Sequence, residues 1–130
     1  VLVEMQDLAE QLAASLKGDT RAKAHSRTQL ELRFHGLPIR CVGNDRLSEL
    51  YASLNGIVSI ASILCGTSAA RCAQIAAEHQ TIVDALRQGD VEQARATLRT
   101  HLRNACLDLV SHLPKLERQE SLFDSGPPSE

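Results

Sequence analysis

Aromatic side chains are scarce in this chain. Its 130 residues include no tryptophan, one tyrosine and two phenylalanines, and aromatic residues make up only 2% of it. The hydrophobic 43% must therefore consist mainly of leucine, isoleucine, valine and alanine. Leucine and alanine favour helices, whereas strands are enriched in aromatic and β-branched residues. Length and composition together predict one all-helical domain with a modest core.

A concentration of positive charge is also lacking. The 14 lysine and arginine residues are scattered among 16 acidic ones, and the net charge is −2. This pattern excludes a strong electrostatic grip on a nucleic-acid backbone. No apolar run approaches the roughly 20 residues that cross a bilayer, and the start, Val1-Leu2-Val3-Glu4, has no basic region followed by an apolar stretch. We expect neither a membrane span nor a signal peptide.

Cysteine pairs with zinc-finger spacing are missing. Cys41, Cys65, Cys72 and Cys106 lie in segments with helical patterns, and none forms a C-x-x-C pair. We interpret them as small buried hydrophobic residues rather than as redox or metal-binding groups. Thiols without a disulfide pattern are typical of a reducing compartment, so we expect a cytoplasmic protein.

Four glycines divide the chain at nearly even intervals, and each is followed by a residue suited to start a helix. Glycine readily adopts the left-handed conformation that ends a helix, and Asp, Asn or Thr can accept hydrogen bonds from the first N–H groups of the next. The pairs are Gly18-Asp19, Gly43-Asn44, Gly66-Thr67 and Gly89-Asp90. They predict five helices near residues 1–17, 22–42, 45–64, 68–88 and 91–113. Short connections favour an antiparallel, up-and-down bundle.

The C-terminal end breaks this pattern. Pro114 follows the last apolar stripe, and Gly126, Pro127 and Pro128 come after a charged stretch. We expect residues 114–130 to form a disordered tail, which leaves 1–113 as the folded domain. The first residues already follow a helical pattern without an initiating methionine, so we expect the chain to be a fragment of a longer protein.

Metal-ligand side chains lie on three of the predicted helices. Glu31 and His35 are one turn apart on one face, while His79 and His101 each lie on an apolar stripe. A single histidine on such a stripe is more often a core residue bonded to a carbonyl group. Burying four titratable groups without a partner is costly, however, and one shared cation would satisfy them all. Imidazole with one carboxylate suits zinc, nickel, cobalt, manganese or iron better than calcium.

Other candidate residues give weaker signals. Arg27 lies one turn before Glu31 and is a candidate to bind an anionic ligand, although an exposed arginine is the commoner outcome. His25 lies at the start of its helix, where solvent exposure is expected. His112 lies near the predicted end of the last helix, where a protonated ring would favour the helix dipole.

At these residues the chain resembles the C-terminal ligand-sensing domain, FCD, of FadR-type regulators in the GntR family. The family pattern D-x-x-F-H, with an Asn nine residues after the His, is matched by Glu31-Leu32-Arg33-Phe34-His35 and Asn44, with Glu31 in place of the Asp. The second half of the family pattern is matched by Glu78-His79, Ile82, Ala85-Leu86, Gly89-Asp90, Ala94, Leu98 and His101-Leu102.

This resemblance covers roughly residues 1–113 and implies a helical sensing domain that is not an enzyme. It implies that Glu31, His35, His79 and His101 bind a divalent metal, with zinc or nickel as the first candidates, and that a small organic acid completes the coordination. It also implies a homodimeric transcription regulator. DNA would be bound only by an N-terminal winged helix-turn-helix domain, which is absent from the sequence given.

Three alternatives remain open at this point. A metal-dependent hydrolase would use the same donors to activate water, but Glu78 is the only further candidate for its base, and its neighbour His79 takes the inward face. A ferritin-like di-iron site needs Glu-x-x-His pairs, whereas Glu31 and His35 are four residues apart. The third alternative is a metal-free helical dimerisation module with buried neutral histidines.

Overall fold

Five α-helices make up most of the described part of the chain. The structure, a computed structural model, describes residues 1–15, 24–65 and 68–123. The helices are α1 (Leu2–Ser15), α2 (Ala24–Cys41), α3 (Asp45–Cys65), α4 (Ala69–Gln88) and α5 (Val91–Phe123). No strand occurs within these described ranges. The prediction of an all-helical fold is confirmed.

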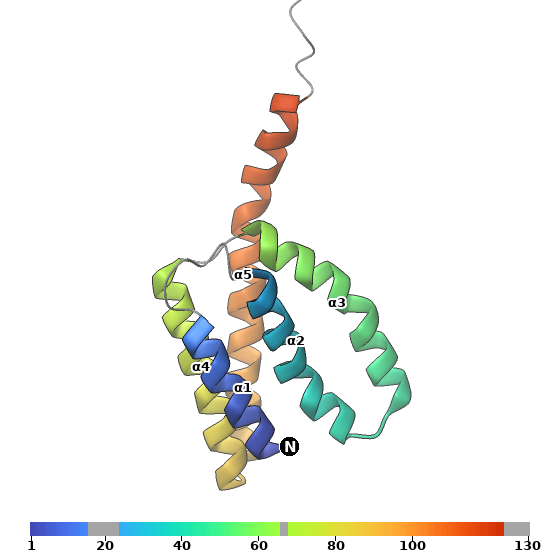
Figure 1. Cartoon of the computed structure of the whole chain (residues 1–130), viewed down its shortest axis with the longest axis vertical. Helices are drawn as coiled ribbons and strands as arrows, with labels where there is room; N and C mark the ends of the chain where they lie inside the picture. The colour runs from blue at the N-terminus through green and yellow to red at the C-terminus, as the bar shows by residue number, and fades with distance from the viewer. Residues whose placement is uncertain (16–23, 66–67, 124–130) are drawn as a thin grey trace, which may run out of the picture.

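The helices alternate in direction along the chain, so that the bundle is of the up-and-down type (Figure 1). α1 packs against α2 and α4, and α4 packs against α5. α3 instead contacts α2 and α5, and it lies at the side of the molecule away from α1 and α4 (Figure 1). The bundle therefore consists of a packed body formed by α1, α2, α4 and α5, with α3 attached to one side.

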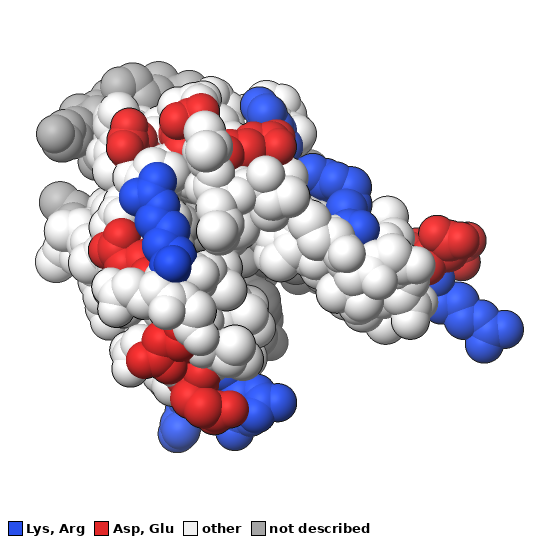
Figure 2. Space-filling model, turned by 90° about the horizontal axis from the view of Figure 1, so that it is seen from below, with Lys and Arg blue, Asp and Glu red and all other residues white. Residues whose placement is uncertain are grey.

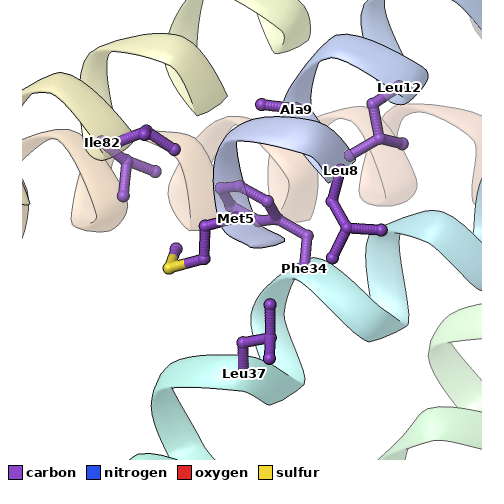
Figure 3. Close-up of a cluster of buried hydrophobic side chains, with 8 residues drawn as sticks. Met5, Leu8, Ala9, Leu12, Phe34, Leu37 and Ile82 are labelled. Carbon is purple, nitrogen blue, oxygen red and sulfur yellow. The ribbon is translucent and has the colours of Figure 1, made fainter. Parts of the chain in front are cut away.

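The apolar face of α1 forms the centre of the core. Its buried residues follow helical spacing and contact α2 and α4 (Figure 3). The core residues are Met5, Leu8, Ala9 and Leu12 from α1, Phe34 and Leu37 from α2, and Ile82 and Val83 from α4. Full burial of each large apolar side chain contributes about 1.5–3 kcal/mol. This cluster fixes α2 relative to α4, on which the candidate site depends.

The predicted helix junctions are present at two of the four glycines. Gly89 has a φ of 71°, and its N–H and that of Asp90 bond back to the carbonyl groups of Leu86 and Ala85. The Asp90 carboxylate then accepts a hydrogen bond from the backbone N–H of Gln93 at 2.9 Å. This arrangement ends α4 and starts α5 within two residues, which explains their antiparallel packing.

Of the other three predicted junctions, one is confirmed and two lie outside the described residues. Gly43 has a φ of 66°, and the side chain of Asn44 accepts a hydrogen bond from the N–H of Leu47 at 3.0 Å. The pairs Gly18-Asp19 and Gly66-Thr67 lie outside the described residues. The cap of α4 is Ser68, one residue later than expected, and its hydroxyl accepts from the N–H of Arg71.

The last helix is longer than its sequence pattern predicts. α5 continues through Pro114 to Phe123, so the predicted end near residue 113 is wrong, and residues 114–123 do not form the disordered tail that was expected. A proline removes one backbone hydrogen bond, but the residues from 115 to 120 are mostly good helix formers. Residues 124–130 lie outside the described part of the chain.

The surface carries charges of both signs. On the face shown in Figure 2, basic and acidic side chains are interspersed, and no large basic patch is visible. The side of the molecule that carries α3 projects from the body in the same view. Among the described residues, no helix is both long enough and apolar enough to span a membrane.

Candidate metal centre

Four donor side chains from three helices meet inside the body. One ligand atom from each of Glu31, His35, His79 and His101 lies within 4.8 Å of the corresponding atoms of the other three. His79 and His101 are buried, and Glu31 and His35 are half-buried. The structure thus brings together the four residues that the sequence pattern selects.

The positions of the α2 donors follow from the burial of Phe34. Phe34 is 1% exposed and belongs to the core cluster that the buried face of α1 forms with α2 and α4. The ring centroid lies 4.5 Å from that of His79 and 5.2 Å from that of His35, with the His35 ring perpendicular. Phe34 anchors α2 in the core. This position holds His35, the next residue, and Glu31, one turn before His35, towards α4 and α5.

The closest contacts lie between α2 and α4. Nε2 of His79 is 3.2 Å from Oε2 of Glu31 and 3.4 Å from Nε2 of His35, and Nε2 of His35 is 3.5 Å from the same Glu31 oxygen. Between two neutral rings, only one of the two facing Nε2 atoms can donate a hydrogen bond; if neither carries a proton, two lone pairs face each other. The two Nε2 atoms and the Glu31 oxygen thus place up to three lone pairs around one point. A divalent cation at this point would accept all three, so the donor set fits a metal.

The His79 ring is held by packing. Its Nδ1 atom is buried and has no hydrogen-bond partner within the described residues. Its ring contacts the rings of Phe34, His35 and His101, whose centroids lie 4.5, 5.3 and 4.7 Å away. A ring that is fully buried and packed against three others has little room to turn, so its neighbours limit the direction of Nε2.

His101 enters from α5 and is held by a carboxylate. Its Nδ1 lies 2.8 Å from Oε2 of Glu78. Burial lowers the pKa of His101, the charges of His79 and His35 lower it further, and the pKa falls to about 4 although Glu78 and Glu31 oppose the shift. At neutral pH the ring is therefore uncharged, which is the form that binds metals.

Glu31 supplies the negative charge of the cluster. Burial raises its pKa, but the hydrogen bonds and charges of His35 and His79 outweigh burial and bring the pKa well below its ordinary value. The carboxyl group is therefore ionised at neutral pH. Three imidazoles and one carboxylate together offer four donors and a single negative charge.

Sequence reasoning missed a polar network beside the cluster. From the sequence, Glu78 is only a weak candidate for a base, and Arg71, Asn104 and Asp108 give no signal of their own. Arg71 bonds to Glu78 and Asp108, and Asn104 bonds to Glu78. The spacing from His101 does give a signal, because Asn104 and Asp108 lie three and seven residues after it and so share its face.

The remaining candidate residues give mixed outcomes. Arg27 is only 6% exposed, so the expectation that it is exposed is wrong, and its role in ligand binding stays a prediction. His25 is exposed as expected, whereas the His112 side chain lies outside the described part of the structure.

The cysteine interpretation is correct for one residue of the three whose side chains are described. Cys72 is 1% exposed, but Cys41 and Cys106 are exposed. The reason is position, since Cys41 is the last residue of α2 and Cys106 lies on a face of α5 that the described helices leave uncovered. The side chain of Cys65 is outside the described residues.

A groove of about 350 Å³ separates α2 from α3. Arg33 and Arg40 of α2 line it opposite Tyr51 and Asn55 of α3. None of the four donor residues lines this groove, so it is distinct from the donor cluster.

Comparison with known families agrees with the all-helical architecture. The family model of the FCD domain matches residues 1–104, a range that includes all four donors. No curated protein and no solved structure matches the chain. Because the family match spans most of the 130 residues, this chain belongs to the FCD domain family.

Proposed function

We propose that this domain senses a small organic acid through a divalent metal held by Glu31, His35, His79 and His101, as part of a GntR-type, FadR-subfamily transcription regulator. FCD domains are regulatory sensing domains, which supports a role in regulation and not in catalysis. The observation that carries the metal proposal is the meeting of four donor atoms from three helices within 4.8 Å.

The chemistry of the donor set supports a transition metal. Neutral imidazoles and a carboxylate are preferred by zinc and nickel, with cobalt, manganese and iron as further candidates. Four protein donors with one negative charge would leave a bound divalent metal with net positive charge. The metal would supply the attraction for the carboxylate of an organic acid, and Arg27, buried one turn before Glu31, is the candidate for a second contact with that acid.

The location of the cluster supports a regulatory role. Its donors belong to α2, α4 and α5, so occupation of the site would change how these helices pack together. A ligand that binds one arrangement more tightly shifts the population towards it. In a cytoplasmic homodimer, the shift would alter the spacing of N-terminal winged helix-turn-helix domains on DNA, with reciprocal coupling typically of about 1–3 kcal/mol.

A hydrolase is the main competing function, and the surroundings of Glu78 argue against it. A hydrolase needs a base next to the metal-bound water. Both carboxylate oxygens of Glu78 accept hydrogen bonds from side chains, namely those of His101, Asn104 and Arg71. A carboxylate occupied in this way is poorly placed to accept a proton from water.

Metal binding is tested with the tag-free chain, stripped by a chelator and then titrated with zinc or nickel. We expect one metal per chain and an increase in Tm, because a metal at a hundredfold its Kd stabilises the folded state by about 2.7 kcal/mol. His35→Ala should remove this increase. His25→Ala is the matched control, since His25 lies on the same helix and is exposed. Equal metal responses of the two variants would exclude His35 as a ligand.

Sensing is tested by a screen of organic acids with and without the chelator. An acid that raises the Tm only of the metal-loaded protein, and that is recovered unchanged, supports the sensor. Conversion of the acid to a product supports the hydrolase instead. A wild-type chain that takes up no metal at all supports the dimerisation module.

A further inference from the structure

Three polar side chains converge on Glu78, just outside the donor cluster. Its Oε2 lies 2.8 Å from Nδ1 of His101, and its Oε1 accepts a hydrogen bond from Nδ2 of Asn104, also at 2.8 Å. Nη1 of Arg71 lies 3.2 Å from both oxygens. The Glu78 side chain is only 11% exposed, so these contacts are shielded from water.

The contact with His101 determines which ring nitrogen is available to a metal. A carboxylate can only accept, so the proton between the two groups belongs on Nδ1 of His101. The lone pair is then on Nε2. Histidines that bind metals commonly donate their other N–H to a carboxylate, which fixes both the tautomer and the orientation of the ring.

The network extends along the interface between α4 and α5. Arg71 and Glu78 are two turns apart on α4, and Arg71 also donates from Nε to Asp108 of α5. The Arg71 guanidinium group lies against both oxygens of Glu78 and also reaches Asp108, so it ties Glu78 to both helices.

We propose that Glu78 is a positioning residue that holds His101 in the Nδ1–H tautomer for metal binding, and that Arg71 keeps Glu78 in place by bridging it to Asp108. This inference rests on the proposed metal site. Glu78 lies outside the four donors, and its effect on the metal acts through His101.

The test compares Glu78→Gln with Asp84→Asn, a matched carboxylate-to-amide change on the same helix. Asp84 accepts a hydrogen bond from Gln80 and has no contact with the cluster among those that the described residues show. Zinc binding is measured by competition with a chromophoric chelator. We expect the Kd of Glu78→Gln to rise about 10–100-fold, the range for loss of such an outer partner. Asp84→Asn should bind zinc as the wild type does, and Arg71→Gln should fall between them.

A second readout separates positioning from a general effect on folding. Long-range ¹H–¹⁵N spectra of the metal-free wild type report the tautomer of each histidine. We expect His101 in the Nδ1–H form, and a shift towards Nε2–H in Glu78→Gln, because the glutamine amide can itself donate to Nδ1. The wild-type spectrum remains decisive even where the variant fails to fold.

The outcomes distinguish this inference from the function on which it rests. Wild-type protein that binds zinc while Glu78→Gln binds it equally well overturns only the positioning role. An Nε2–H tautomer of His101 in the metal-free wild type does the same. A wild type that binds no zinc overturns the metal site and the positioning role together.

Discussion

Helices α1 and α3 carry similar apolar stripes, yet only one of them is buried. Met5, Leu8 and Leu12 of α1 are at most 1% exposed. On α3, Leu50, Leu54 and Ile57 are 58%, 47% and 67% exposed. The difference follows from neighbours, since α1 lies between α2 and α4, whereas α3 contacts α2 and α5 from the side. Helical spacing identifies an apolar face, but the packing of other helices decides whether it is covered.

The difference between the packed body and α3 also applies to the candidate metal site. The four donors belong to α2, α4 and α5, and α1 ties α2 to α4 through the core cluster. α3 contributes none of the donors. Its described link to α2 includes the hydroxyl of Tyr51, which donates to the carbonyl oxygen of Leu32 at 3.1 Å. The body should therefore carry most of the stability and the metal site, and α3 should carry little of either.

The largest expected effect comes from truncating the core face of α1. Leu12→Ala should lower the free energy of unfolding by about 2–5 kcal/mol, because Leu12 is fully buried and its loss leaves a cavity. Leu54→Ala on α3 should change it by less than about 0.5 kcal/mol, as expected for an exposed position. Urea unfolding of both variants measures the difference.

This comparison fails if the two substitutions cost the same. A large cost for Leu54→Ala that grows with protein concentration would show that a second copy covers α3 in solution. A large cost independent of concentration would show instead that α3 packs against its own chain.

The next effect is a loss of stability of the metal-free body at acid pH. The pKa of His101 falls from 6.5 to about 4 on folding, so between these values the unfolded chain binds more protons than the folded one. The contribution of His101 to the free energy of unfolding is therefore fully present above pH 6.5 and is lost as the pH falls towards 4. A pKa difference of this size corresponds to about 3 kcal/mol. Thermal unfolding in the presence of a chelator, measured across this window, gives the slope.

His101→Gln should remove that part of the slope, and His25→Gln should keep it. Glu31 and Glu78, whose pKa values are also lowered, lose their contribution only below their ordinary value of 4.5. The effect of His101 can thus be measured between pH 6.5 and pH 4.5, above the pH range in which the two carboxyl groups act. A wild-type stability that is constant between pH 6.5 and pH 4.5 would contradict a neutral, buried His101.

Much of the fold was predictable because the signals are local. Glycine followed by a capping residue marks Gly43-Asn44 and Gly89-Asp90 as junctions, and both are confirmed. The end of α5 was not predictable in this way, because Pro114 is compatible with either a helix end or a helix that loses one hydrogen bond. The exposure of α3 depends on contacts distant in sequence, which periodicity does not encode.

The convergence of the four donors was also predictable, but the support for His101 was not. His35 follows Glu31 by one turn, and His79 and His101 lie within apolar stripes, so their inward direction can be derived from spacing alone. Glu78 and His79 are about 100° apart on α4, which places them on different faces. Both faces are covered, because α4 has α1 on one side and α5 on another. Sequence spacing does not show how many sides of a helix are buried.

A smaller and opposite pair of effects is expected at two glycines. Neither has any atom within 4 Å of an added Cβ, so only the backbone conformation distinguishes them. Gly89→Ala should lower the free energy of unfolding by about 1–2 kcal/mol, because its φ of +71° is unfavourable for alanine. Gly56→Ala within α3 should raise it by about 0.5–1 kcal/mol, provided that α3 unfolds together with the body.

The result for Gly56→Ala shows whether α3 unfolds together with the body. An increase in stability from Gly56→Ala shows that folding of α3 is coupled to the global transition. No change in the global transition, together with a gain in helix content by circular dichroism, shows that α3 unfolds separately at lower denaturant.

The smallest expected effect is a change in the titration of Tyr51, the only tyrosine of the chain. Burial raises its pKa above the ordinary 10.0, and the charge of Glu31 raises it further. Glu31→Gln should therefore lower the pKa of Tyr51 towards 10.0 without reaching it, while Glu49→Gln, at an exposed position of α3, leaves it unchanged. Ultraviolet absorbance of the phenolate follows the titration, with no tryptophan to interfere. A wild-type pKa of 10.0 would mean that α3 is not docked against α2. Because bound zinc would offset the charge of Glu31, added zinc should shift the titration in the same direction as Glu31→Gln does.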